Sequence, residues 1–368
     1  QTVSRSSHRD VISFLLKELD GIEDTLPVNT SYTGSNIGRI SKGAVIALKA
    51  RIYLYESDWQ NVVNECQKLI GTTANGKYAL FPSYTGLFDP ANENNSEVIL
   101  SAGYATGYRT WGDMIDMVPL SAGARDNALA PTQELINDYM MMNGKLTTDP
   151  SSGFDINNPY VNIDPRMAAT VVYDGYPWQR ANGSIDTIQI KPGSNTPEEY
   201  KPGGSATSTG YYVRKYYDPT SGTACNSGLD LMLIRYADVL LMYAEAENEL
   251  GQFNEDTWNT TIKALRTRAG FTDASALSYN ASWSQSDLRT IIRRERRCEL
   301  ALEGLRVFDI RRWKTAQTVL NGYVHGAHFG DQSVDGGYIR VAQRRFDPTR
   351  HYLWPVPLIE QSLDGNLG

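Results

Sequence analysis

The stretch DLRTIIRRERRCELALEGLRVFDIRRW, residues 287–313, restricts the fold of this chain more than any other. At 100° per residue its apolar side chains fall on one side of a helix: Leu288, Ile291, Ile292, Cys298 and Leu302. Glu295, Glu299 and Glu303 fall on that same side, each about one turn after the last. Like charges four residues apart repel each other, and unpaired carboxylates are costly to bury. The pattern therefore predicts that the three glutamates have positively charged partners.

Arginine is abundant in the same stretch, at positions 294, 296, 297, 306, 311 and 312. The three glutamates are either a catalytic carboxylate cluster or part of an internal ion-pair network that fixes how helices dock. Their helical phase points them into a packed face, whereas the two carboxylates of a glycosidase flank a cleft, so structural pairing is favoured. Arg51, on the apolar face of a helix expected at 41–55, is predicted to meet one of them. The predicted network comprises Arg51, Glu295, Arg296, Glu299, Glu303, Arg306, Asp309 and Arg312.

The residue pattern of this stretch, ER-x-x-EL-x-x-EG-x-R-x-x-D-x-x-RW, resembles the C-terminal signature of the SusD/RagB family. The matching positions are Glu295, Arg296, Glu299, Leu300, Glu303, Gly304, Arg306, Asp309, Arg312 and Trp313. Other blocks similar to the family follow the same order along the chain, among them GRISKGAVIALKARIYLY, SEVILS, RYADVLLMYAEAENELG and YLWPVP. The resemblance implies a mainly α fold of tetratricopeptide-like helical hairpins with a loop-rich insertion that contains short β-strands.

The resemblance also implies a function: non-catalytic binding of an oligosaccharide at the bacterial cell surface and its delivery to a SusC-like TonB-dependent transporter. Family members carry a further N-terminal segment with a lipidated cysteine, so attachment to the outer membrane is expected only through a lipid anchor outside this chain. A peptide receptor of the same architecture, a glycoside hydrolase and a helical scaffold that binds only protein remain alternatives. No cofactor and no metal are expected.

Composition narrows the class of function. The 368 residues carry a net charge of −7 at a pI near 5.3, which argues against a nucleic-acid-binding protein. The three cysteines lie far apart without C-x-x-C spacing, and His325 and His328 beside Asp331 are interpreted as surface histidines rather than metal ligands. The sequence has no run of about 18 apolar residues. Tyrosine outnumbers phenylalanine, 22 to 9, which suits a surface that holds polar, ring-shaped ligands.

The chain, 1–368, is expected to form a single domain whose helical scaffold comprises residues 1–70 and 231–313. Helices are predicted at 1–26, 41–55 and 59–70, and a helical hairpin at 231–270, with Leu233 on its inner face. Residues 71–230, rich in glycine, asparagine and tyrosine, form the insertion and the expected ligand face. Strands are predicted there at 97–101, 167–173, 185–190 and 211–217, with one helix at 131–142. Residues 314–368 are a loop-rich closing segment with an extended stretch at 352–358.

Aromatic residues in loops are the predicted ligand-binding residues, because binding side chains gather on loops held by a rigid scaffold and rigid rings stack on sugar faces at low entropic cost. Three such groups occur in the chain. Their members are Tyr108, Arg109 and Trp111, then Tyr176, Trp178 and Arg180, and finally Trp283.

Overall fold

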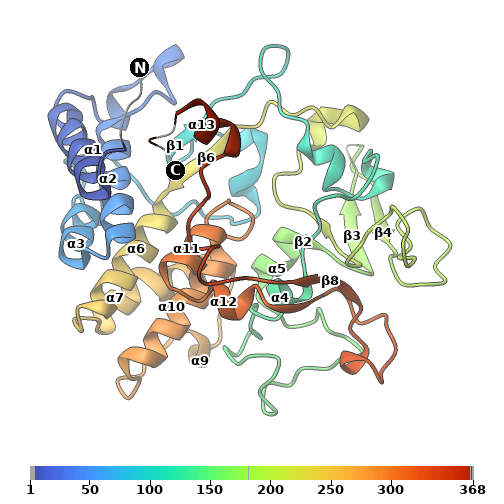
Figure 1. The fold of residues 1–368 in the computed structure, drawn as a ribbon. Helices are drawn as coiled ribbons and strands as arrows, with labels where there is room; N and C mark the ends of the chain where they lie inside the picture. The colour runs from blue at the N-terminus through green and yellow to red at the C-terminus, as the bar shows by residue number, and fades with distance from the viewer. Residues whose placement is uncertain (1–4, 181, 365, 367–368) are drawn as a thin grey trace.

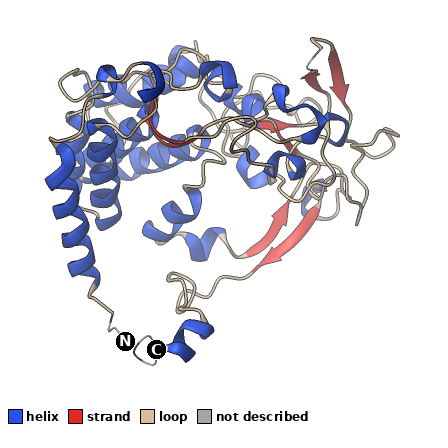
Figure 2. Cartoon of the chain, turned by 90° about the horizontal axis from the view of Figure 1, so that it is seen from above, coloured by secondary structure: helices blue, strands red, loops and turns tan. Residues whose placement is uncertain are grey.

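The computed structural model describes residues 5–180, 182–364 and 366. A layer of helices occupies one side of the molecule, and the loop-rich insertion with its short strands occupies the other (Figure 1). Seen from above, the strands form separate short pairs among helices and loops (Figure 2). The largest apolar core lies mainly among the helices. Of the smaller cores, one joins Cys298 and Ala301 to residues of the insertion, and another lies inside the insertion.

The first helices are α1 (His8–Glu23), α2 (Lys42–Glu56) and α3 (Trp59–Gln67). Ser7 caps α1 by accepting a hydrogen bond from the backbone N–H of Asp10. Ser57 adopts a left-handed conformation with φ 58°, so the chain reverses and α3 packs back against α2. Small side chains on α2, such as Ala47 and Ala50, are fully buried and let the two helices approach closely.

The second helical pair begins later than the sequence predicts. Leu231–Arg235 forms strand β6, and helix α6 starts only at Tyr236 and runs to Glu249. Burial alternates along β6, so Met232 and Ile234 face inward while Leu233 is 51% exposed. The expected place of Leu233 on the inner helical face was therefore wrong. The return helix consists of α7 (Glu255–Trp258), a π-helical turn (Asn259–Lys263) and α8 (Ala264–Ala269).

The helix expected across 287–313 is broken into two. Helix α10 spans Gln285–Glu299, and α11 spans Arg306–Arg312. Between them Leu302 has φ 62° and Gly304 has φ 79°, so the chain leaves helical geometry. Glu303 therefore lies in a turn, and the exposed Leu302 does not share the apolar face of α10. Three short helices complete this part: α9 (Ala274–Leu277), α12 (Ala316–Val319) and α13 (Leu358–Leu363).

The insertion is closed at its base by an antiparallel pair, in which β1 (Val98–Ala102) lies beside β6. The other pairs are β2 (Val171–Val172) with β5 (Tyr212–Val213), β3 (Tyr176–Gln179) with β4 (Ile185–Ile188), and β7 (Gly322–His325) with β8 (Arg340–Arg344). All are antiparallel. The sequence did not predict β3, β7 or β8.

Several predicted elements of the insertion change type or length, and the strand expected at 211–217 shortens to Tyr212–Val213. Residues 167–170 are the end of helix α5 (Pro165–Thr170) rather than strand, because Asp164 caps the helix and Pro165 suits its first turn. Only Gln133–Ile136 of the expected helix at 131–142 is helical, as α4. The chain beyond it bends through a turn in which Gly144 has φ 78° and Met141 bridges to Ile163.

Candidate ligand-binding site

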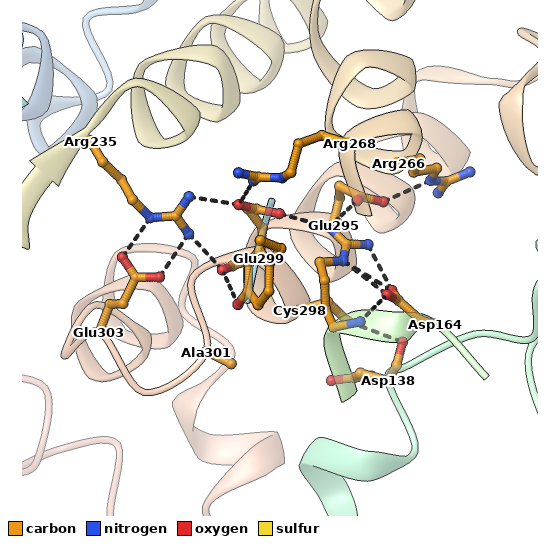
Figure 3. Close-up of polar contacts among 12 residues, drawn as sticks. Asp138, Asp164, Arg235, Arg266, Arg268, Glu295, Cys298, Glu299, Ala301 and Glu303 are labelled. Atoms are coloured by element: carbon orange, nitrogen blue, oxygen red, sulfur yellow. Dashed lines mark hydrogen bonds and ion pairs between the residues drawn. The ribbon is translucent and has the colours of Figure 1, made fainter. Parts of the chain in front are cut away.

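The three glutamates of the signature lie inside the molecule, each beside cationic side chains (Figure 3). Glu295 contacts the guanidinium groups of Arg166 at 2.6 Å and Arg266 at 2.8 Å. Glu299 contacts Arg166 at 2.9 Å, Arg235 at 2.6 Å and also Arg268. Because every partner holds at least one glutamate from α10, the carboxylates tie separate elements together.

Glu303, in the turn after α10, completes the group. Its carboxylate contacts Arg235 and Lys215, both at 2.7 Å. Arg235 and Arg268 also hold Glu97, at 2.6 and 2.8 Å. We call the resulting set the buried cluster. Its five acids are Glu97, Asp164, Glu295, Glu299 and Glu303, and its five bases are Arg166, Lys215, Arg235, Arg266 and Arg268.

The bases of the buried cluster come from α5, the insertion, β6 and α8, and none is an arginine of the stretch 287–313. Along α10, Arg296 and Arg297 follow Glu295 by about 100° and 200° of helical rotation, so they leave the helix from other faces. Formal charges balance within the cluster. Burial acts to raise the pKa of Glu299, but Arg268, Arg235 and Arg166 outweigh it and lower that pKa well below its usual range.

A second, smaller group of ion pairs lies around α6. Arg51 contacts Asp238 at 2.6 Å, and Arg296 contacts Asp238 at 2.5 Å and Asp309 at 2.8 Å. Arg312 joins Asp309 at 2.9 Å to Glu245 at 2.6 Å. The prediction that Arg51 meets one of the three glutamates was wrong, because α2 packs against α6 and its arginine reaches the first turn of that helix.

Arg306 differs from the other arginines of the predicted network. Within the described part of the chain, no carboxylate lies within ion-pair distance of it, and its guanidinium lies 6.0 Å from the ring centre of Trp313. The break between α10 and α11 turns this side chain away from the buried cluster. Its expected membership of the network was therefore wrong.

The predicted ligand-binding residues fall in three different environments. Trp178 on β3 is 1% exposed, with Tyr217 at 4.5 Å between ring centres, so its faces are covered and it cannot be a stacking platform. The hydroxyl of Tyr176 donates to the carbonyl oxygen of Ala168, which places this tyrosine against α5. Trp283 packs on Trp258, with 5.1 Å between ring centres, in the core of the helical layer. These three side chains fill space beneath loops.

The loop that contains Tyr108, before the short helix η5 (Asp113–Asp116), is the most open of the predicted groups. Tyr108 is 95% exposed, and the guanidinium of Arg109 lies 4.5 Å from the ring centre of Tyr104. Trp111 is half-buried, and its indole N–H donates to the carbonyl oxygen of Leu229 at 2.8 Å. The tip of this loop is therefore free to contact a ligand, whereas Trp111 anchors its base.

Arg180, the remaining predicted residue, lines a pocket of about 290 Å³ in the insertion. We call it the insertion pocket. Its walls are Thr85, Gly86, Phe88, Asp89, Ala169, Gln179, Arg180, Gly183, Arg214, Lys215, Tyr216, Tyr217 and Pro219. The end of β3, the short helix η3 (Gly86–Phe88) and the segment after β5 bring these residues together.

Arg214 is the side chain that sequence reasoning missed. Its guanidinium lies 5.5 Å from the ring centre of Trp178 and 5.4 Å from that of Tyr217, and among the described residues it has no carboxylate within ion-pair distance. The next-but-one residue, Tyr216, has φ 65°, a strained conformation for a bulky side chain. A clue was present in the sequence, because the arginine interrupts a run of tyrosines, YYVRKYY.

The pocket offers hydrogen-bonding groups of both kinds around aromatic walls. Gln179, Arg180 and Arg214 can donate, and Asp89 can accept. Arg180 is partly engaged, since its Nε contacts Asp186 at 2.6 Å and its Nη1 donates to the carbonyl oxygen of Ser121. Such a mixture suits a neutral polyhydroxylated ligand, which presents both donors and acceptors.

Metal ligands and membrane-spanning helices are two further features that bear on the site. No group of three or more histidine, cysteine, aspartate or glutamate side chains arranged to hold a metal ion occurs in the described ranges. Among the residues that the structure describes, no helix combines the length and the apolar character needed to cross a membrane.

Comparison with known proteins decides the family, since residues 96–367 match the SusD family over most of the chain. The chain belongs to the SusD family. Its mostly helical architecture with small two-stranded sheets is the SusD-like fold, and the family consists of non-catalytic binding proteins. The interpretation of the three glutamates as architecture rather than catalytic machinery agrees with this membership.

Relatives of this SusD-family chain are longer than it is. SusD-like protein P2 of Formosa agariphila is 27% identical over 377 residues, which cover 99% of this chain and 65% of that protein, so the chain spans less than two thirds of that relative. A SusD-like carbohydrate binding protein from Bacteroides fragilis matches with a TM-score of 0.88 and 26% identity, over 100% of this chain and 72% of that one. A third protein, crystallised with a xylogluco-oligosaccharide, matches with a TM-score of 0.70 and 18% identity, over 100% and 73% of the two chains, and shows the fold alone.

Proposed function

We propose that this SusD-family chain captures an oligosaccharide in the insertion pocket without cleaving it. The observation on which the proposal rests is Arg214, a guanidinium held against two aromatic rings with no carboxylate partner among the described residues, at the wall of a pocket. A charged donor that is positioned but not neutralised is available to a ligand. The similarity to the Bacteroides fragilis carbohydrate binding protein supports a sugar as that ligand.

Capture of a sugar follows from the groups in the pocket. Hydroxyls of a neutral sugar both donate and accept, so they can pair with Asp89 as an acceptor and with Arg214 and Gln179 as donors. Phe88 and Tyr217 provide apolar walls for the C–H faces. Because the sugar exchanges hydrogen bonds to water for hydrogen bonds to protein, each exchange contributes only about 1 kcal/mol, and the affinity of one site is modest.

The exposed loop tip with Tyr108 and Arg109 is proposed as a second contact for a longer chain of sugars. Delivery of the captured sugar to a SusC-like TonB-dependent transporter, from a position on the bacterial outer membrane, completes the proposed function. Family membership supports both parts.

The test is affinity gel electrophoresis on a panel of neutral polysaccharides such as xyloglucan, galactan and starch. We expect at least one polysaccharide to retard the chain, and Arg214→Gln to weaken that binding at least tenfold, which is about 1.4 kcal/mol. Arg39→Gln is the matched control, because Arg39 is exposed and lies outside the pocket. Tyr108→Ala, tested in the same way, measures how much the loop that contains Tyr108 contributes to polysaccharide binding.

Three results would count against the proposal. Release of reducing ends from the retarding polysaccharide would make the chain a hydrolase. Retardation that Arg214→Gln leaves unchanged would place the site elsewhere on the surface. Binding of peptides with no retardation by any polysaccharide would favour the peptide-receptor alternative.

A further inference from the structure

A second and larger pocket, of about 620 Å³, lies on a different part of the molecule. It sits where the turn between α10 and α11 meets α4, α12 and the β7–β8 hairpin, elements that adjoin in Figure 1. None of its wall residues belongs to the insertion pocket. We call it the arginine pocket. A ligand bound there would occupy a different site from the proposed sugar site.

The floor of the arginine pocket is apolar. Leu300, Leu305, Ile310 and Leu320 line it, together with Leu302. Leu302 is 41% exposed and is held at φ 62°, a conformation that leucine adopts at an energetic cost. A strained leucine that is presented to a pocket rather than buried points to a role other than packing.

The charges in the wall are almost all neutralised by partners in the protein. Arg296 contacts Asp309 and Asp238, and Arg297 contacts Asp138. Glu134 accepts hydrogen bonds from the backbone N–H of His325 at 2.9 Å and from the ring Nδ1 of that histidine at 2.8 Å. The charges of these groups are compensated within the protein, although Glu134 Oε2 and Arg296 Nη2 have no hydrogen-bond partner among the described residues.

Arg306 and Arg344 are the exceptions. Both line the pocket, and neither has a carboxylate within ion-pair distance among the described residues. Burial and the neighbouring charge of Arg297 lower the pKa of Arg306 to about 10, which still leaves it protonated near pH 7. Asp138 and Asp309 act in the opposite direction but only partly offset the effect of burial. A half-buried guanidinium without an ion-pair partner is an unfavourable arrangement that a bound anion would relieve.

The amide side chain of Asn321, which also lines the pocket, is satisfied. The side chain of Asn321 donates to the carbonyl oxygens of Gln317 and Phe346 and accepts from the N–H of Phe346. The body of a ligand would meet the leucines and isoleucine of the wall. Pockets of about 300–1,000 Å³ accept small molecules, so the volume suits a compact ligand.

We propose that the arginine pocket binds a small amphipathic carboxylate, whose acid group meets Arg306 and Arg344 and whose hydrocarbon body lies on Leu302 and its apolar neighbours. The ligand class is a short-chain or medium-chain carboxylic acid. A carboxylate without a hydrocarbon body would meet arginines that are open to water. A hydrocarbon without a carboxylate would leave the charges of Arg306 and Arg344 uncompensated. The ligand therefore needs both parts.

Isothermal titration with octanoate tests the proposal, with acetate and octan-1-ol as probes that each lack one half of the chemistry. We expect octanoate to bind at least tenfold more tightly than either probe. Arg306→Gln and Arg344→Gln should each weaken octanoate at least tenfold, and Leu302→Ser should weaken it several-fold. Arg345→Gln is the matched control, since Arg345 is the exposed neighbour of Arg344 outside the pocket, and should bind as the wild type does.

The proposal is overturned if octanoate fails to bind, if octan-1-ol binds as tightly as octanoate, or if Arg306→Gln and Arg344→Gln both leave the affinity unchanged. Arg344 is exposed, so its substitution tests the pocket even if Arg306→Gln perturbs the turn. Polysaccharide retardation of the same variants is measured in parallel. Loss of octanoate binding with normal retardation separates this pocket from the proposed sugar site.

Discussion

At the scale of single residues, the stability of this molecule depends on where its buried charges meet. Glu299 joins three arginines from α5, β6 and α8, and Arg235 joins three glutamates in return. Removal of one partner from such a set leaves the others buried and uncompensated, which costs more than an intact pair contributes. The effect of a substitution is therefore governed by the charges left behind.

Glu299→Gln keeps the shape of the side chain but removes its charge. We expect the free energy of unfolding to fall by about 3–5 kcal/mol, because Arg235, Arg268 and Arg166 then share one negative charge fewer in a buried site. Urea unfolding followed by circular dichroism measures the change. Glu360→Gln on the exposed α13 is the control and should leave the urea midpoint close to that of the wild type. A midpoint for Glu299→Gln equal to that of the control would contradict the expectation.

At the scale of elements, helix α10 is held at both ends by local signals. Ser284 accepts a hydrogen bond from the N–H of Asp287 while the Asp287 carboxylate accepts one from the N–H of Ser284, a capping box. At the other end the left-handed Leu302 and Gly304 stop the helix. That stop sends Glu303 toward Arg235 and leaves Arg306 at the arginine pocket.

Loss of the cap of α10 should be measurable. Ser284→Ala removes the side-chain acceptor for the N–H of Asp287, so we expect the unfolding free energy to fall by about 1 kcal/mol. Ser286→Ala, two residues along in the same exposed first turn, is the control and should change stability by less. Equal midpoints for the two variants in urea unfolding would show that the capping box adds nothing.

At the scale of the whole molecule, the buried cluster joins the insertion to the helical layer. Lys215 and Arg166 come from the insertion, Arg266 and Arg268 from α8, and the glutamates from α10 and the turn after it. One apolar core, in which Cys298 of α10 and Ala301 pack with residues of the insertion, also spans the two sides. The charged junction between them therefore makes the position of the pocket walls depend on ionised carboxylates.

Acid should weaken this junction. The pKa values of Glu295, Glu299 and Glu303 are lowered in the folded chain, because the surrounding arginines outweigh burial, which acts to raise them. Their unfolded pKa is about 4.3, so the unfolded chain takes up protons first as the pH falls. Their contribution to stability is complete above about pH 5 and is lost progressively below it. Asp164, whose pKa is raised by burial, contributes with the opposite sign.

Urea midpoints at pH 3.5, 5 and 7 test this dependence. We expect the midpoint to fall between pH 5 and pH 3.5, and to fall less in Glu299→Gln than in the wild type, because the variant lacks one of the titrating groups. The comparison between the two proteins cancels the contribution of exposed carboxylates. Parallel pH profiles for wild type and variant would contradict the assignment.

The sequence by itself determined the helices α1, α2 and α3 and the need for partners around Glu295, Glu299 and Glu303, because periodicity and charge are local properties of the chain. It also contained the family signature. Only the tertiary structure decided which cations pair with those glutamates. The partners come from elements distant in sequence: Arg166, Arg235, Arg266 and Arg268. The same holds for the pockets: Trp178 is aromatic and lies near a loop, yet packing buries it, and Arg214 becomes available only where β3, η3 and the segment after β5 meet. Burial and proximity across long sequence separations depend on how elements pack, and no local pattern encodes them.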